Sequence, residues 1–145
     1  MTILHDRQKR LGLILYLVSI HSLAVGLGLI LLPLSLMPHF GFQVAVEKFF
    51  PVQGGVFHIV MSLAYAMAGY RTLRQEDLIV LSIAAKFTAT VFLVAYGLFV
   101  HPIWMVWLSA LGDAIMGSVI LWAWRDCRRQ SGPTAMKGLA ETDRD

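Results

Sequence analysis

The sequence predicts an all-α integral membrane protein, folded as an up-down four-helix bundle with a short amphipathic segment on its outer face. Of the 145 residues, 57% are hydrophobic and 14% are charged, whereas soluble domains carry about 25% charged residues. The apolar residues form four blocks, each close to the roughly 20 residues that a helix needs to cross a bilayer. This composition excludes a water-soluble globular protein.

The four blocks define four transmembrane helices within one domain, residues 11–125. The first block follows a basic segment, as in a secretory signal, but it is longer than the signal's apolar core of about 7–15 residues and lacks an Ala-x-Ala site. We therefore interpret it as a retained helix. The helices are expected at about residues 11–32, 52–70, 78–100 and 103–124.

The basic residues predict the orientation of these helices. Ten of the twelve Lys and Arg residues lie in the N-terminal residues 1–10, the turn between the second and third helices, and the segment after residue 124, which all share one side. The opposite side holds only Lys48. Because cytoplasmic segments carry the excess of Lys and Arg, both termini are expected in the cytoplasm.

The remaining segments fit this topology. Tryptophans at both ends of the fourth helix match the two aromatic belts of a membrane protein. The tail, residues 126–145, is polar and without apolar periodicity, which predicts disorder. The basic residues lie at the ends of apolar blocks and form no interleaved patch, so no nucleic-acid partner is expected and the bilayer is the predicted environment.

The first connection contains the amphipathic segment. Its apolar face and its polar face are each formed by residues at helical spacing, which predicts a short helix lying on the outer leaflet. The alternative is a partly buried loop that plugs the bundle. The apolar face comprises Phe42, Ala45, Val46, Phe49 and Phe50, and the polar face comprises Gln43, Glu47 and Lys48.

Each predicted helix carries one ionisable residue inside the hydrocarbon: His21, His58, Lys86 and Asp113. A lysine or aspartate at this depth costs about 2.5–3.5 kcal/mol on insertion scales, so such groups are expected to face the bundle and find partners. The helical rise of about 1.5 Å per residue places all four in one middle slab of the membrane. Together they form the candidate functional site.

Two pairings are open for Asp113. His21 and Asp113 are nearly level on neighbouring helices, so a hydrogen bond between them is favoured. Lys86 is offset from Asp113 by about four residues, or roughly 6 Å, and helical side chains lean toward their own N-terminus, which directs these two apart. A direct ion pair still competes with extension of the lysine toward the inner interface.

Three functions and one structural role follow from these residues. His21, Asp113 and Lys86, with or without His58, could line a polar cavity for a small amphipathic molecule, such as a quinone head group or a lipid-like metabolite. His21 and His58 could instead ligate a b-type haem, with Lys86 near a propionate. A proton or ion relay is the third function. Otherwise the four residues only connect the helices through hydrogen bonds of about 0.6 kcal/mol each.

Short motifs in residues 11–125 resemble the DoxX-like group of small four-helix bacterial membrane proteins, including its BphX-like members. The resemblance implies the bacterial cytoplasmic membrane and an association with redox or sulfur-oxidising systems. His21 and His58 fall outside the group's pattern. The motifs include Gln53-Gly54-Gly55, Ala84-Ala85-Lys86 and Leu111-Gly112-Asp113.

These features predict a non-catalytic role. The protein is expected to be an accessory subunit of a larger, redox-linked membrane complex, or a binder of a lipid-soluble ligand, and a homo-oligomer is a further option. The short tail leaves little room for a soluble catalytic domain. The alternative is a small membrane oxidoreductase, or a protein that binds b-type haem or a quinone through the intramembrane His, Asp and Lys residues.

Overall fold

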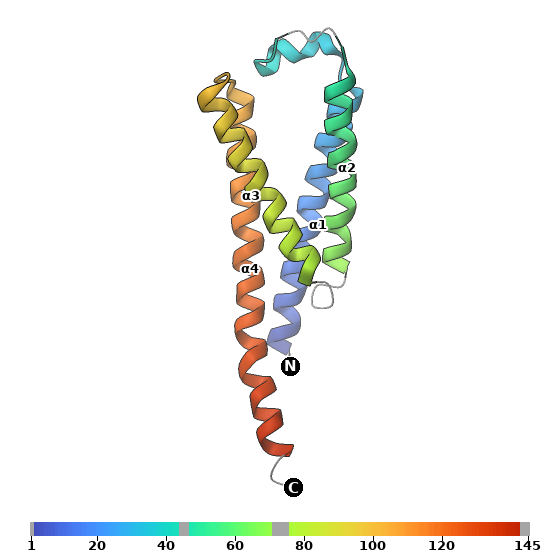
Figure 1. Ribbon diagram of the computed structural model, residues 1–145. Helices are drawn as coiled ribbons and strands as arrows, with labels where there is room; N and C mark the ends of the chain where they lie inside the picture. Colours follow the sequence, from blue (N-terminus) through green and yellow to red (C-terminus); the bar gives the residue numbers. More distant parts are fainter. Residues whose placement is uncertain (1, 44–46, 71–75, 143–145) are drawn as a thin grey trace.

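The computed structural model describes the backbone of residues 2–43, 47–70 and 76–142, and the side chains of residues 6–43, 47–70 and 76–129. Within these ranges every regular element is a helix, and four are long and apolar enough to cross a membrane. They run alternately up and down (Figure 1), which confirms the predicted four-helix membrane bundle. The helices are α1 (Thr2–Leu31), the 3-10 helix η1 (Leu34–Phe40), α2 (Phe49–Tyr70), α3 (Glu76–Phe99) and α4 (Trp104–Thr142).

The bundle consists of two helical hairpins. α1 packs mainly on α2 and α3 packs mainly on α4, while fewer contacts join the two hairpins, most of them between α1 and α4. Figure 1 shows the hairpins together where α1 begins and apart where η1 lies. We call these the basic end and the η1 end. Most of the predicted cytoplasmic Lys and Arg residues flank the helices at the basic end.

Glycines bring the two helices of each hairpin into close contact. A methyl group added at Gly26 of α1 would lie 2.7 Å from the carbonyl oxygen of Gly55 of α2, and the reverse distance is also 2.7 Å. In the second hairpin, Gly97 leaves room for the Trp107 ring, 2.9 Å from the position of such a methyl group. Small residues are needed here because lipid provides no hydrophobic drive between helices, so close packing must hold them.

A buried apolar cluster to which all four helices contribute lies in the half of the bundle at the basic end, while Ile103, Val106 and Ala110 are buried separately at the η1 end. An ion pair from Arg7 of α1 to Asp126 of α4 closes this half at the membrane surface. Many large apolar side chains are exposed along the outer faces of the helices, as expected where helices meet lipid. The core residues are Leu11, Leu15, Val18, Tyr65, Ala68, Ile79, Ile120, Ala123 and Cys127.

Two helices extend beyond the predicted spans. α1 begins at Thr2, within the basic N-terminal segment, and α4 continues to Thr142, through the tail that the sequence predicts to be disordered. The difference has a local cause, because residues 134–141 include Ala, Met, Lys, Leu and Glu, which are strong helix formers. The predicted spans marked the apolar part of these two helices and not their full length.

The first connection differs from the predicted amphipathic helix. Its helix is η1, which lies earlier in the chain and ends at Gly41 with a φ of 85°. The Gly41 N–H donates to the Pro38 carbonyl and the Phe42 N–H donates to the Met37 carbonyl, so the chain turns back toward the bundle. No helix spans residues 42–50 in the described part: Ala45 and Val46 lie outside it, and Phe49 and Phe50 already belong to α2. α2 starts there because Pro51 favours a first helical turn.

Candidate functional site

The centre of the bundle holds a buried ion pair between α3 and α4. The Lys86 ammonium donates to the Asp113 carboxylate over 2.6 Å, and the two side chains are 4% and 12% exposed. The lysine therefore forms the direct ion pair with Asp113 and does not extend toward the inner interface of the membrane.

A glycine explains how this pair forms across the predicted offset. A methyl group added at Gly117 would lie 3.1 Å from Cβ of Lys86, so the lysine backbone is level with Gly117 and not with Asp113. Gly117 follows Asp113 by one helical turn, about 6 Å along the axis. The flexible lysine stem spans this turn by running along α4 over the glycine.

Lys86 also connects the two hairpins. Its ammonium lies 5.5 Å from the centroid of the Tyr65 ring of α2, a cation–π distance. Thr90 donates its hydroxyl hydrogen to the Lys86 carbonyl over 2.9 Å, which satisfies that hydroxyl within α3. The buried cation is thus held by a carboxylate from its own hairpin and by an aromatic face from the other.

Hydrogen bonds between α1 and α2 hold His58 in place. The Ser22 hydroxyl donates to the His58 carbonyl over 3.0 Å and lies 3.2 Å from its Nδ1. A hydroxyl has a single hydrogen, so both contacts are satisfied together when Nδ1–H of His58 donates to the Ser22 oxygen. Nε2 of the neutral ring is then an acceptor. One turn away, the Ser19 hydroxyl donates to the Ser62 carbonyl over 2.7 Å.

The four predicted site residues lie in one region but do not form one hydrogen-bonded cluster. His21 precedes Ser22, which hydrogen-bonds to His58, and Lys86 pairs with Asp113. His21 is nevertheless exposed, and among the described residues no hydrogen bond joins it to Asp113. The favoured His21–Asp113 pairing is therefore not present in the described part of the chain, where Lys86 donates to Asp113 instead.

The geometry does not fit a haem between His21 and His58. A bis-histidine haem needs the porphyrin ring to stand between two imidazoles, and thus between the helices that carry them. Here Ser22 hydrogen-bonds to His58 directly, and the two backbones touch about one turn away at Gly26 and Gly55. The described residues also contain no group of three or more His, Cys, Asp or Glu side chains that could hold a metal ion.

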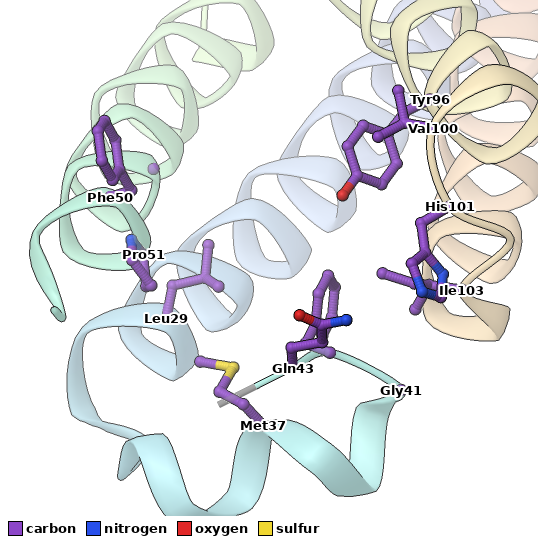
Figure 2. Close-up of a pocket in the computed structure, with 12 residues that line it drawn as sticks. Leu29, Met37, Gly41, Gln43, Phe50, Pro51, Tyr96, Val100, His101 and Ile103 are labelled. Atoms are coloured by element: carbon purple, nitrogen blue, oxygen red, sulfur yellow. The ribbon is translucent and has the colours of Figure 1, made fainter. Parts of the chain in front are cut away.

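A space that could hold a ligand lies at the η1 end. A cavity of about 560 Å³, which we call the η1 cavity, is bounded by α1, η1, α2, α3 and the turn to α4. Figure 2 shows Leu29, Met37 and Pro51 on one side, Tyr96 and His101 on the other, and the Gln43 amide between them. The lining residues are Leu29, Met37, Gly41, Phe42, Gln43, Phe50, Pro51, Gly54, Tyr96, Val100, His101 and Ile103.

The lining of the η1 cavity is apolar with three polar groups. These are the Gln43 amide, the Tyr96 phenol and the His101 imidazole, and no lining residue is Asp, Glu, Lys or Arg. The volume is within the range of about 300–1,000 Å³ typical of small-molecule sites. The cavity can therefore accept an uncharged molecule with an apolar body and a group that forms hydrogen bonds.

This position differs from the cavity expected from the sequence. None of His21, His58, Lys86 and Asp113 lines the η1 cavity, although His58 follows the lining residue Gly54 by about one turn of α2. The sequence does not single out the cavity residues, because most of them are the apolar side chains that any membrane helix contains. Ser22, Tyr65 and Gly117 were also missed as partners of the predicted residues.

No family model, curated protein or solved structure matches the chain. The resemblance to the DoxX-like group stays a prediction that rests on the short motifs. Three residues of those motifs have defined positions here: Gly54 lines the η1 cavity, and Lys86 and Asp113 form the buried ion pair.

Proposed function

We propose that the protein binds an uncharged, lipid-soluble molecule in the η1 cavity, and that a quinone is the chemical class that fits it. The observation that carries this proposal is the lining of the cavity, which is apolar, contains three hydrogen-bonding groups and has no acidic or basic residue other than His101. Binding is proposed here for the η1 cavity and not for the ion pair at the centre of the bundle.

The polar groups favour a head group that accepts hydrogen bonds. The Tyr96 hydroxyl and the Gln43 amide can both donate, and they face the same space as the His101 imidazole (Figure 2). The two carbonyl oxygens of a quinone are suitable acceptors for such donors. The flat ring and the isoprenoid tail would meet the apolar side chains, of which Leu29 and Phe50 come from different helices.

An anionic ligand fits less well. A carboxylate or phosphate in this cavity would lack a Lys or Arg partner, and a buried charge without a partner is costly. The Lys86 ammonium cannot serve, because Asp113 already neutralises it. The ion pair is better explained as the connection that holds α3 to α4, which supports a binding role over a catalytic role for this chain.

Fluorescence quenching by a quinone tests the proposal. Trp104 borders the cavity, since a methyl group added at the lining residue Gly41 would lie 3.2 Å from its Cδ1 atom. Purified protein in nanodiscs would be titrated with ubiquinone-1, and saturable quenching of tryptophan fluorescence is expected. Quenching that rises linearly, as for free partitioning into the bilayer, would contradict the proposal.

Two glycine variants separate the cavity from the rest of the helices. Gly54→Leu places a side chain in the cavity, whereas Gly112→Leu adds the same group where nothing lies within 4 Å. We expect Gly54→Leu to weaken binding by about tenfold or more, equivalent to about 1.4 kcal/mol, and Gly112→Leu to leave it unchanged. Equal effects of the two variants would reject the η1 cavity as the site.

A second pair of variants tests the head-group contact. Tyr96→Phe removes a hydroxyl that faces the cavity, and Tyr16→Phe removes one from an exposed position on α1. A hydrogen bond contributes about 0.5–1.5 kcal/mol, so the first variant is expected to weaken binding by about two- to tenfold. Tyr16→Phe is the matched control and should bind as the unmodified protein does.

A further inference from the structure

At the basic end, we propose that two arginines held over tryptophan rings bind the phosphate groups of anionic phospholipids. The guanidinium carbon of Arg10 lies 5.9 Å from the centroid of the Trp122 ring, and that of Arg128 lies 5.1 Å from the Trp124 ring. The first pair joins α1 to α4 and the second lies within α4. We call them the Arg–Trp pairs.

The Arg–Trp pairs leave the arginine donors available. Arg7 forms an ion pair with Asp126, but neither Arg10 nor Arg128 forms an ion pair with any carboxylate of the described residues, and both are exposed. A cation over an indole ring is attracted to the face of the ring, and this contact occupies none of the five N–H donors of the guanidinium. The planar guanidinium can therefore still bind two oxygens of one phosphate.

The tryptophans set the height of these cations in the bilayer. Tryptophan side chains concentrate at the membrane–water interface, and Trp122 is 57% exposed. A guanidinium held over such a ring lies at the level of the lipid phosphates. On α1, Leu13 and Leu17 follow Arg10 toward the membrane centre and are also exposed, so they can contact the acyl chains of a lipid whose head group binds Arg10.

The ring of the second pair is held from the inside of the bundle. Trp124 is partly buried and packs against the core of the basic end, and its indole nitrogen is buried, so the nitrogen is not a donor for a lipid. The ring therefore serves as a fixed support for Arg128, whose own N–H groups are the donors. An acidic protein or a nucleic acid is a weaker candidate, because both would have to reach side chains that the indoles hold at the bilayer interface.

Native mass spectrometry of the detergent-solubilised protein tests the proposal. The protein would be titrated with phosphatidylglycerol or with phosphatidylcholine of the same acyl chains. We expect preferential retention of phosphatidylglycerol, and inorganic phosphate at millimolar concentration should not displace it, because a free phosphate lacks the acyl chains. Equal retention of the two lipids, or displacement by inorganic phosphate, would overturn the proposal.

Four arginine variants identify the site. Arg10→Gln and Arg128→Gln should each weaken binding of phosphatidylglycerol by about fivefold, the effect of one cation at the membrane surface. Arg125→Gln and Arg129→Gln remove exposed cations that stack on no described ring, and should each have a clearly smaller effect. If all four variants weaken binding equally, charge alone explains it and the Arg–Trp pairs are rejected.

A conservative variant separates stacking from charge. Arg10→Lys keeps the positive charge but loses the planar group, so it should weaken binding measurably, by less than Arg10→Gln. Unchanged binding by Arg10→Lys would contradict a stacked site. Circular dichroism checks that helix content is retained, and ubiquinone-1 quenching should be unaffected in these variants because the η1 cavity lies at the other end of the bundle.

Discussion

The two halves of the bundle are built from helices of similar composition but pack differently. At the basic end all four helices share one buried core, from Leu11 and Leu15 on α1 to Cys127 on α4. At the η1 end each hairpin stays tightly packed on its own, through Gly55 in one and Gly97 in the other. Between the hairpins at this end lies the η1 cavity.

The difference shows how a small membrane protein can be both stable and open. Close contact between α1 and α2 depends on glycines and serines, which occur along the whole length of both helices. Contact between the hairpins depends on larger side chains, such as Tyr65 and Ile120, that fill the basic-end half. Lys86 and Asp113 lie where this core ends and the hairpins begin to separate.

The largest expected effect is at the ion pair. Lys86→Met leaves Asp113 as an unpaired buried carboxylate, and loss of one partner of a buried ion pair costs about 3–5 kcal/mol. The double variant Lys86→Met with Asp113→Leu should recover most of this loss, because no unpaired charge remains. Steric-trapping measurements of unfolding free energy in bicelles would show whether the double variant is the more stable of the two.

Side-chain truncation should distinguish the two halves. Leu15 is fully buried in the basic-end core, whereas Leu98 near the η1 end is 62% exposed. Leu15→Ala is expected to lower the free energy of unfolding by about 2–3 kcal/mol, in the lower part of the range for buried leucines, since the unfolded side chain stays in lipid. Leu98→Ala should change it by less than about 0.5 kcal/mol, and similar losses for both would contradict the burial of Leu15 in the core shared by the four helices.

Substitution of glycines by alanine tests the close contact between α1 and α2 at the η1 end. At Gly55 the added methyl group would meet backbone, which costs about 1–3 kcal/mol against a gain of about 1 kcal/mol in helix propensity. A net loss of about 1 kcal/mol in unfolding free energy is expected. At Gly112 the added methyl group has no atom within 4 Å, so Gly112→Ala should raise the free energy of unfolding. The two variants are therefore expected to change this free energy in opposite directions.

The smallest effect is expected at the membrane surface. The Arg7 and Asp126 side chains are 26% and 29% exposed, and ion pairs near water contribute about 0–1 kcal/mol. Asp126→Asn should therefore lower the unfolding free energy by less than about 1 kcal/mol. The difference between this variant and the unmodified protein should become smaller at high salt, because salt screens exposed charges. A loss as large as that of Lys86→Met would mean that this pair, and not the buried core, holds α1 to α4.

The sequence was sufficient to predict the helices because hydropathy and charge act locally. The predicted span at residues 52–70 lies within α2 and that at residues 78–100 nearly coincides with α3, since each block must fill the bilayer. The four-residue offset between Lys86 and Asp113 was also predictable, because the tight turn after α3 fixes the register of the second hairpin.

The contacts between helices were harder to predict. The pairing of Asp113 depended on the reach of a flexible lysine and on space left by Gly117, and neither appears in a hydropathy pattern. The position of the η1 cavity depended on the separation of the hairpins, which is set by packing of residues far apart in the chain. His21 is exposed, and a hydropathy pattern does not show which side of α1 faces the other helices.

Distances between the hairpins test the central claim most directly. Spin labels would be attached in pairs to cysteines introduced at exposed positions of α2 and α3 in a Cys127→Ser background. Val56 with Phe92 spans the hairpins near the η1 end, and Met67 with Val80 spans them near the basic end, and all four side chains are exposed.

Double electron–electron resonance should then give a narrow distance distribution for the Met67–Val80 pair, unchanged by ubiquinone-1. The Val56–Phe92 pair should give a broader distribution that narrows when ubiquinone-1 fills the η1 cavity. Two equally narrow distributions, both insensitive to the quinone, would contradict a bundle that is closed at one end and open for a ligand at the other.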